Sequence, residues 1–327
     1  MTTASDSLNG RGRVQAETRQ RLVELADELG YRANPTARSL RKGATNSIGL
    51  YFPDDVLTMP YYMDLAQGAA EGAAAHGLAL TLIPAWRDVE RMMSFPIDGL
   101  VVVDPVLGDP VLEQLNKLHV PVVTCELDLT PNSSYSGGVT IDHAPAVREL
   151  LDHLAGQGAT AIALIAPPLT TSWATVVRAT YLIWCDEHGQ TPMLRELILA
   201  ASPYDVRKEV DSLLDQNPRP DAIISAPDGG AIGTLMAASE RGLSVPEDIL
   251  VASCVDSATL QLCSPAITAI NLHPRQTGRQ VAEILVALVL GESTETVWEE
   301  VAIKLEIRAS TKGVPSRGDS RRSDEAR

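Results

Sequence analysis

The stretch APAVRELLDHLAGQGATAIALIA (144–166) joins an amphipathic helix to a strand that is apolar throughout. The same alternation continues in both directions from this stretch and begins at Ser47. Apolar strands separated by helices are typical of a parallel sheet that is covered on both faces. We expect strands at 47–52, 79–84, 99–104, 121–126, 138–142, 161–166, 222–226 and 249–254, and helices at 61–77, 144–158, 229–242 and 276–291.

The strand series is too long for one sheet and breaks near residues 156–160. A chain of 327 residues is also long enough for about two domains. We therefore predict an α/β fold of two doubly wound parallel-sheet lobes. In such folds a ligand cleft lies at the carboxyl ends of the strands.

Composition and motifs exclude several classes of protein. No apolar run is long enough to span a membrane, and no apolar leader opens the chain, so we expect a cytoplasmic protein. The sequence contains no dinucleotide-binding, P-loop, GxSxG or HExxH motif, which argues against an enzyme and against a cofactor. The cysteines have no metal-binding spacing, and we interpret the histidines as surface or capping groups: Cys125, Cys185, Cys254 and Cys263; His76, His119, His143, His153, His188 and His273.

The two ends of the chain differ in charge from its acidic body. Residues 1–46 carry eight Arg or Lys and five Asp or Glu, whereas the whole chain has a net charge of −15. A basic end on an acidic body suits contact with a polyanion, although so small an excess is equally compatible with chance. A helix is expected at 16–30 and a short, marginal one between Pro35 and Gly43, and the tail at 312–327 is expected to be disordered.

Ordered motifs over residues 2–311 resemble the lactose/galactose-repressor family of bacterial transcription regulators. They begin with SLNGRGRV (7–14), ETRQRL (17–22), LGYRANPTARSL (29–40) and SIGL (47–50). They continue in the body with PYYMDL (60–65), IDGLVV (97–102), RPDAIISAPD (219–228), GLSVPEDI (242–249) and SPAITAI (264–270).

The resemblance implies a periplasmic-binding-protein type of sensor behind a helix-turn-helix head and a hinge helix. It implies a homodimer that binds operator DNA, acts as a repressor, and responds to a sugar or other small metabolite between its lobes. We expect the head and hinge at 1–46 and the sensor at 47–311. Lobe 1 would comprise 47–157 and 272–296, and lobe 2 would comprise 158–271 and 297–311.

The resemblance also implies DNA-contacting positions. The recognition helix would contribute base contacts, the following loop phosphate contacts, and the hinge a leucine that wedges into the minor groove. These residues are Thr2, Thr3, Ser5, Asp6, Asn9, Arg11, Arg13, Ala37, Arg38 and Leu40. Leu40 is the wedge, and its alternative is an ordinary linker leucine.

About sixteen residues that precede the recognition helix in the family are absent before Thr2. Such a head would lack half of its small core. Two explanations remain open: the true start lies upstream, which we favour, or the chain is a truncated sensor or solute-binding protein that no longer binds DNA. No metal is expected in either case.

The resemblance also implies cleft residues, some of which depart from the family pattern. They are Tyr61, Tyr62, Ser172, Arg178, Asp228, Val255 and Asp256. Val255 replaces the first aspartate of a GFDD motif, and Pro227-Asp228 replaces Asn-Asp. Because each change removes a polar contact, two expectations stay open: the ligand is less sugar-like than is usual, or the cleft binds nothing tightly. Tyr61 and Tyr62 would stack on the effector, with simple helix-start packing as the alternative.

Overall fold

The computed structural model describes residues 15–28, 44–52, 56, 59–83, 90, 94–227 and 229–312. The predicted DNA-contacting residues, the expected hinge helix and Asp228 lie outside the described residues, as does the tail from 313. The expected N-terminal helix is α2 (Ala16–Glu28), on which Leu25 is 49% exposed. Among the described residues, no helix combines the length and apolarity needed to cross a membrane.

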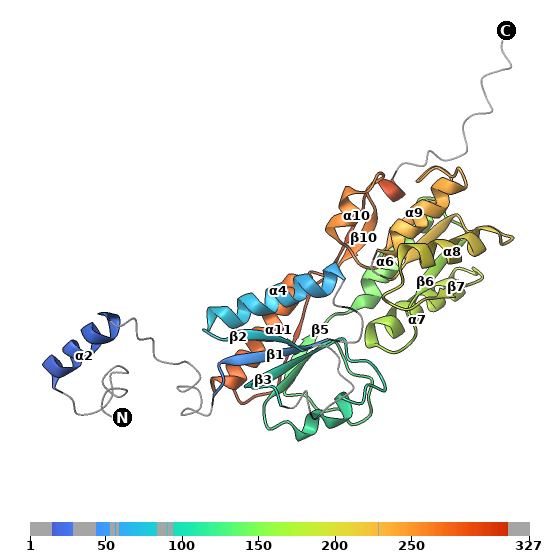
Figure 1. The fold of residues 1–327 in the computed structure, drawn as a ribbon. Coiled ribbons are helices and arrows are strands. Elements are labelled where there is room, and N and C mark those ends of the chain that lie inside the picture. Colours follow the sequence, from blue (N-terminus) through green and yellow to red (C-terminus); the bar gives the residue numbers. More distant parts are fainter. Residues whose placement is uncertain are drawn as a thin grey trace, which may run out of the picture.

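The first lobe is built on a six-stranded parallel sheet in the order β11-β5-β4-β3-β1-β2 (Figure 1). Helices α4 (Pro60–Ala75) and α11 (Pro274–Val289) bury their apolar faces on one side of it. The 3-10 helix η1 (Leu112–Lys117) covers the other side. The strands are β1 (Ser47–Tyr51), β2 (Ala79–Ile83), β3 (Gly99–Val103), β4 (Val122–Cys125), β5 (Gly137–Thr140) and β11 (Val297–Glu300).

The second lobe has a six-stranded sheet in the order β12-β10-β9-β8-β6-β7, in which only β12 is antiparallel to its neighbour. Helices α6 (His143–Gly156) and α7 (Ser172–Glu187) cover one face, and α8 (Pro203–Leu214) and α9 (Gly230–Glu240) cover the other. Short elements α10 (Ala258–Leu262) and η2 (Ala309–Thr311) complete the lobe. Its strands are β6 (Ile162–Ala166), β7 (Met193–Glu196), β8 (Ala222–Ser225), β9 (Leu250–Ser253), β10 (Thr268–Asn271) and β12 (Lys304–Glu306).

The two-lobed fold is confirmed, but the predicted crossings between lobes need correction. Helix α6 was expected in the first lobe, yet its buried side chains pack in the core of the second lobe with α7 and β6. Strand β11 was expected in the second lobe, yet it pairs with β5 in the first sheet. The chain therefore crosses near residues 142, 272 and 301 instead of 157, 271 and 296. An amphipathic helix shows which face is apolar, and it does not show which of two sheets that face covers.

Helices α4 and α11 come from distant parts of the chain and cross at unusually close range. A Cβ added at Gly68 would overlap the carbonyl oxygen of Arg275, and one added at Gly278 would overlap the carbonyl oxygen of Leu65. The two glycines therefore let the backbones touch. Around the crossing, Arg275 and Arg279 both pair with Glu71. This contact fastens the returning C-terminal segment onto the first lobe.

We predict that Gly278→Ala destabilises the protein by about 1–3 kcal/mol, because the added methyl group must push the two helix backbones apart. Urea-induced unfolding followed by circular dichroism measures this change. Gly156→Ala is the matched control, since nothing lies within 4 Å of a Cβ at that helical position. The control should be neutral or slightly stabilising. An equal loss of stability in both variants would contradict the close-crossing argument.

Candidate functional site

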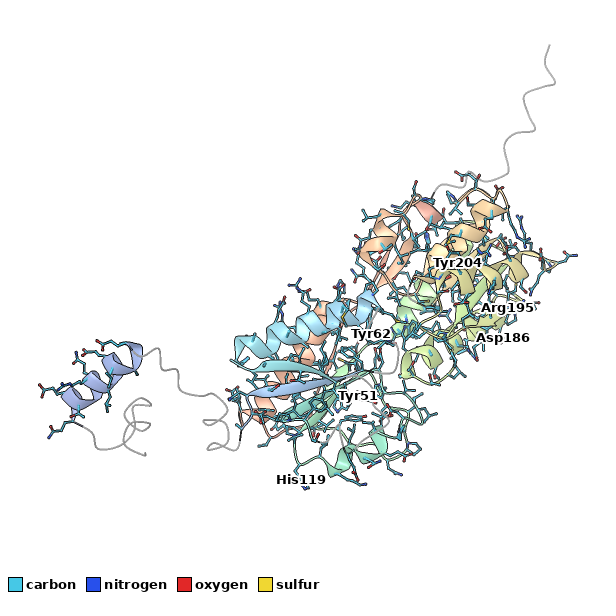
Figure 2. The ribbon with its side chains drawn as sticks, viewed as in Figure 1. Tyr51, Tyr62, His119, Asp186, Arg195 and Tyr204 are labelled. Atoms are coloured by element: carbon cyan, nitrogen blue, oxygen red, sulfur yellow. The ribbon has the colours of Figure 1, made fainter. Side chains whose placement is uncertain are left out.

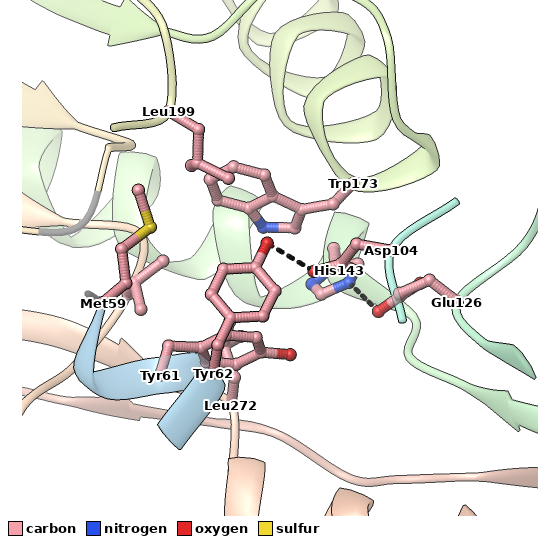
Figure 3. Close-up of a pocket in the computed structure, with 10 residues that line it drawn as sticks. Met59, Tyr61, Tyr62, Asp104, Glu126, His143, Trp173, Leu199 and Leu272 are labelled. Atoms are coloured by element: carbon pink, nitrogen blue, oxygen red, sulfur yellow. Dashed lines mark hydrogen bonds and ion pairs between the residues drawn. The ribbon is translucent and has the colours of Figure 1, made fainter. Parts of the chain in front are cut away.

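A pocket lies where the carboxyl ends of the strands of the two lobes face each other. Its cavity volume is about 30 Å³, which is far below the usual range for small-molecule sites, so the two lobes lie close together around it in this arrangement. Figure 2 places Tyr62 on the side of the first lobe that faces the second. The lining residues are Met59, Tyr61, Tyr62, Asp104 and Glu126 from the first lobe, and His143, Trp173, Leu199, Val255 and Leu272 from the second lobe (Figure 3).

Each charged or titratable residue of the pocket lies directly after a strand or at the start of a helix. Asp104 is the first residue after β3, and Glu126 is the first residue after β4. His143 is the first residue of α6, and the side chain of Asp142 caps that helix by accepting a hydrogen bond from the amide of Ala144. Because neighbouring parallel strands end at one edge of a sheet, these side chains converge although they are far apart in sequence.

Two buried carboxyl groups and an imidazole form the polar part of the pocket. The hydroxyl of Tyr62 donates to Oδ2 of Asp104 over 2.7 Å, and Nε2 of His143 lies 2.7 Å from Oε1 of Glu126 (Figure 3). The residues Asp104, Glu126 and His143 are only 8%, 5% and 3% exposed. Burial of this degree makes ionisation sensitive to any further charge that enters.

The pKa of Asp104 is raised from 3.8 to about 7. Burial is the main cause and the nearby charge of Glu126 adds to it, whereas the hydrogen bond from Tyr62 and the proximity of His143 lower the pKa. Asp104 and Glu126 also have positive φ angles, 43° and 76°, which are uncommon for residues other than glycine. Such backbone strain is most often found at functional sites.

Aromatic rings form the floor and one wall of the pocket. The rings of Tyr61 and Tyr62 meet edge to face with centroids 5.0 Å apart, and Tyr62 also meets Phe52 edge to face at 5.9 Å. Burial and the neighbouring carboxylates raise the pKa of Tyr61 well above its ordinary value. The Tyr61 hydroxyl makes no hydrogen bond with the residues that the structure describes. It is therefore available to a ligand.

The second-lobe side of the pocket is predominantly apolar. Trp173 lies near the start of α7, where the Thr171 side chain caps the helix, and Leu199, Val255 and Leu272 follow β7, β9 and β10. Beside the pocket, the amide of Leu107 in the first lobe donates a 2.8 Å hydrogen bond to the carbonyl of Thr170 in the second. The lobes are thus held together at one margin of the pocket.

The pocket contains some of the predicted cleft residues and leaves out others. Tyr61, Tyr62 and Val255 line it. Ser172 is buried at the start of α7, next to Trp173 in sequence but outside the lining. Arg178 donates 2.8 Å hydrogen bonds to Glu196 and to the Pro167 carbonyl.

Asp256 is also engaged elsewhere. Its two carboxylate oxygens accept hydrogen bonds of 2.7 and 2.6 Å from Arg308, a charge-assisted bidentate pair. Asp256 is therefore fully engaged in this conformation, whereas Arg178 bonds only through one terminal nitrogen and its buried Nε has no hydrogen-bond partner among the described residues.

Sequence reasoning missed the acidic cluster of the pocket. His143 was interpreted as a surface or capping group, but the structure buries it against Glu126. The motifs LVVVD (100–104) and VVTCE (122–126) each end a fully apolar strand with a carboxylate. That arrangement, repeated on consecutive strands, was the signal that could have revealed Asp104 and Glu126. Nothing in the sequence indicated Leu199 or Leu272.

Sequence comparisons show what this chain is similar to. A family profile for periplasmic binding protein-like domains matches residues 151–311. Catabolite control protein A of Priestia megaterium is 26% identical over 322 residues, covering 95% of this chain and 96% of that protein.

Solved structures agree with this match. A LacI-family transcriptional regulator from Bifidobacterium animalis subsp. lactis has a TM-score of 0.71 and 27% identity, and the match covers 83% of this chain and all of that one. The lac repressor dimer bound to operator and the anti-inducer ONPF has a TM-score of 0.81, with 94% of each chain covered. At 23% identity this second match supports the fold alone.

We predict that Asp104→Asn makes the protein more stable than the wild type at pH 8, and that this advantage shrinks as the pH is lowered through 5 toward 4. The folded protein keeps a proton on Asp104 that the unfolded chain releases above about pH 4. Its free energy of unfolding therefore falls as pH rises from about 4 to about 7, by up to about 4 kcal/mol. Asparagine removes this dependence and tolerates the positive φ at this position.

Denaturant unfolding at a series of pH values measures the difference between wild type and variant. Tyr62→Phe is the opposing control, because loss of its hydrogen bond raises the pKa of Asp104 further and extends the loss of stability to higher pH. A stability difference between wild type and Asp104→Asn that does not change from pH 5 to pH 8 would contradict the assignment.

Proposed function

We infer that this chain is a DNA-binding regulator of the lactose/galactose-repressor family. A small molecule in the interlobe pocket would control its binding to DNA. The chain is a regulator and not an enzyme. The observation that carries the inference is the pocket itself. It is lined from both lobes of a chain that matches transcription regulators over nearly its whole length.

The position of the pocket supports control through lobe closure. A ligand that contacts both lobes binds best when they lie at one particular separation, so it shifts the population of lobe arrangements. The Leu107–Thr170 hydrogen bond and the small size of the pocket describe one such arrangement. An occupant of different size or charge would favour another arrangement.

We propose that the segment before the sensor lobes binds operator DNA. Its contacts would come from the recognition helix, from the loop with Arg11 and Arg13, and from a minor-groove wedge at Leu40. All of these residues lie outside the described part of the chain. The lac repressor neighbour was solved as a dimer on operator DNA, and by analogy we propose a homodimer that reads a pseudo-palindromic site and acts as a repressor.

Selection from random double-stranded DNA with the full chain tests this function. One enriched, pseudo-palindromic sequence is expected, with an affinity that falls steeply as salt rises. Failure to enrich any sequence at low salt would overturn the proposal. That result would favour the second candidate, a sensor of the same fold that no longer binds DNA.

We predict that Leu40→Ala lowers affinity for the selected site by at least tenfold, because the variant loses the wedge that stabilises bent DNA. Binding to unrelated DNA should weaken much less, since phosphate contacts provide most of that affinity. Fluorescence anisotropy with specific and unrelated duplexes measures both. Leu262→Ala is the control, because Leu262 is 86% exposed on the second lobe. Unchanged affinity of Leu40→Ala for the selected site would refute the wedge.

A further inference from the structure

We propose that the ligand of the interlobe pocket is an organic cation with an apolar body. Its ammonium group would lie at Asp104 and Glu126, and its body would pack against the second lobe. This inference rests on the proposed function, since it specifies the chemical class of the controlling small molecule. It follows from three properties of the pocket: its charge, its aromatic rings and the uneven distribution of its polar groups.

The acidic groups of the pocket outnumber its cationic groups. Among the described residues that line it, none is Lys or Arg, and two are buried carboxylic acids. His143 is the one lining residue that can carry a positive charge, and it is paired with Glu126, whereas Asp104 is hydrogen-bonded to the neutral hydroxyl of Tyr62. A buried carboxylate is stabilised strongly only by a paired charge and hydrogen bonds. A ligand ammonium group supplies both, whereas an anionic ligand would be repelled.

The aromatic residues favour the same kind of ligand. Tyr61, Tyr62 and Trp173 are three of the chain's seven Tyr and four Trp, and all three line this one pocket. Aromatic faces attract ammonium groups and pack well against apolar bodies. The unpartnered Tyr61 hydroxyl can also accept a hydrogen bond from an ammonium group.

The second-lobe side argues against a polyhydroxylated ligand. Its described lining residues Leu199, Val255 and Leu272 offer no side-chain hydrogen bond to a hydroxyl group, Trp173 offers only its indole N–H, and the Nε2 of His143 is already engaged by Glu126. Of the polar groups expected there, Asp256 is paired with Arg308, and Arg178 binds Glu196, although the buried Nε of Arg178 has no hydrogen-bond partner among the described residues. A sugar bridging the lobes would leave hydroxyl groups unpaired on this side, which is unfavourable.

Cation binding should be coupled to release of a proton. The groups that face Asp104 are Tyr61 and Tyr62 from α4, Cys125 and Glu126 at the end of β4, and His143 from α6. A ligand cation beside Asp104 favours its ionised form, so its proton passes to the buffer. Because Asp104 titrates near pH 7, higher pH prepares the pocket for the cation. An alkylammonium group resembles that of lysine and stays protonated over this range.

Isothermal titration of the full chain with benzylamine, 2-phenylethylamine and 3-phenylpropylamine tests the proposal. At least one amine should bind, and about tenfold more tightly at pH 8 than at pH 6, with proton release detected from the buffer dependence of the heat. The neutral isostere 2-phenylethanol, the anion phenylacetate and the sugar cellobiose should bind at least tenfold more weakly.

Two aspartate variants separate binding at the pocket from binding elsewhere. Asp104→Asn should abolish the pH dependence and weaken amine binding by at least tenfold. Asp128→Asn is the matched control, because Asp128 also accepts a 2.7 Å hydrogen bond from a tyrosine, Tyr135, but does not line the pocket. This control should bind the amine as the wild type does.

The outcomes distinguish this inference from the proposed function. The cation assignment would be overturned if no amine bound at millimolar concentration, or if 2-phenylethanol bound as tightly as the amines. It would also be overturned if cellobiose bound more tightly than the amines, or if amine binding survived Asp104→Asn. The regulator proposal would stand in all of these cases if the DNA selection yields a specific site. Amine binding without any selected DNA would instead support the pocket and overturn the regulator.

Discussion

The structure depends on one constraint: two parallel sheets are held with the carboxyl ends of their strands facing each other. The chain passes between the lobes three times, and two of these passages, after β5 and after β10, place the lining residues His143 and Leu272 at the pocket. The close crossing of α4 and α11 fastens the last return to the first lobe. Polar residues placed immediately after these strands therefore meet in the pocket without any local sequence motif joining them.

The part of the fold that the sequence predicted well consists of buried strands. All eight predicted strands are present, and most resemble β3, whose residues are apolar and buried without interruption. The exception is β2, an edge strand that is largely exposed but apolar in sequence. The four missed strands lie near sheet edges or carry charges. In β11, the residues Val297–Glu300 are largely exposed and include two glutamates, and β7 and β12 also mix charged with apolar residues. Hydrophobic patterning cannot reveal such strands, because their register comes from tertiary pairing.

The candidate site was predictable only in part, for a similar reason. Tyr61, Tyr62 and Val255 were expected near a ligand and line the pocket. Arg178 and Asp256 were expected beside them, but each lies in an ion pair whose partner is distant in sequence. Asp104, Glu126 and His143 come from three separate chain segments, so their association required the order of the strands in the sheet. A residue's type is visible in sequence, but its neighbours across a sheet are not.

The acidic cluster links the stability of the empty protein to its response to a ligand. Two features make the pocket edge of the first-lobe sheet less stable than an apolar edge would be. One is the burial of Asp104, which titrates near neutral pH, and the other is the positive φ of Asp104 and Glu126. A cation relieves the electrostatic part of this cost only where it can reach the carboxylates, and its apolar body gains contact only when the second lobe is close. The same ligand therefore neutralises one lobe and attracts the other. Neither the electrostatic gain nor the apolar contact is complete when the lobes are apart. The ligand therefore binds the closed arrangement more tightly than the open one. Control of a distant DNA-binding segment requires such a difference in affinity between two arrangements.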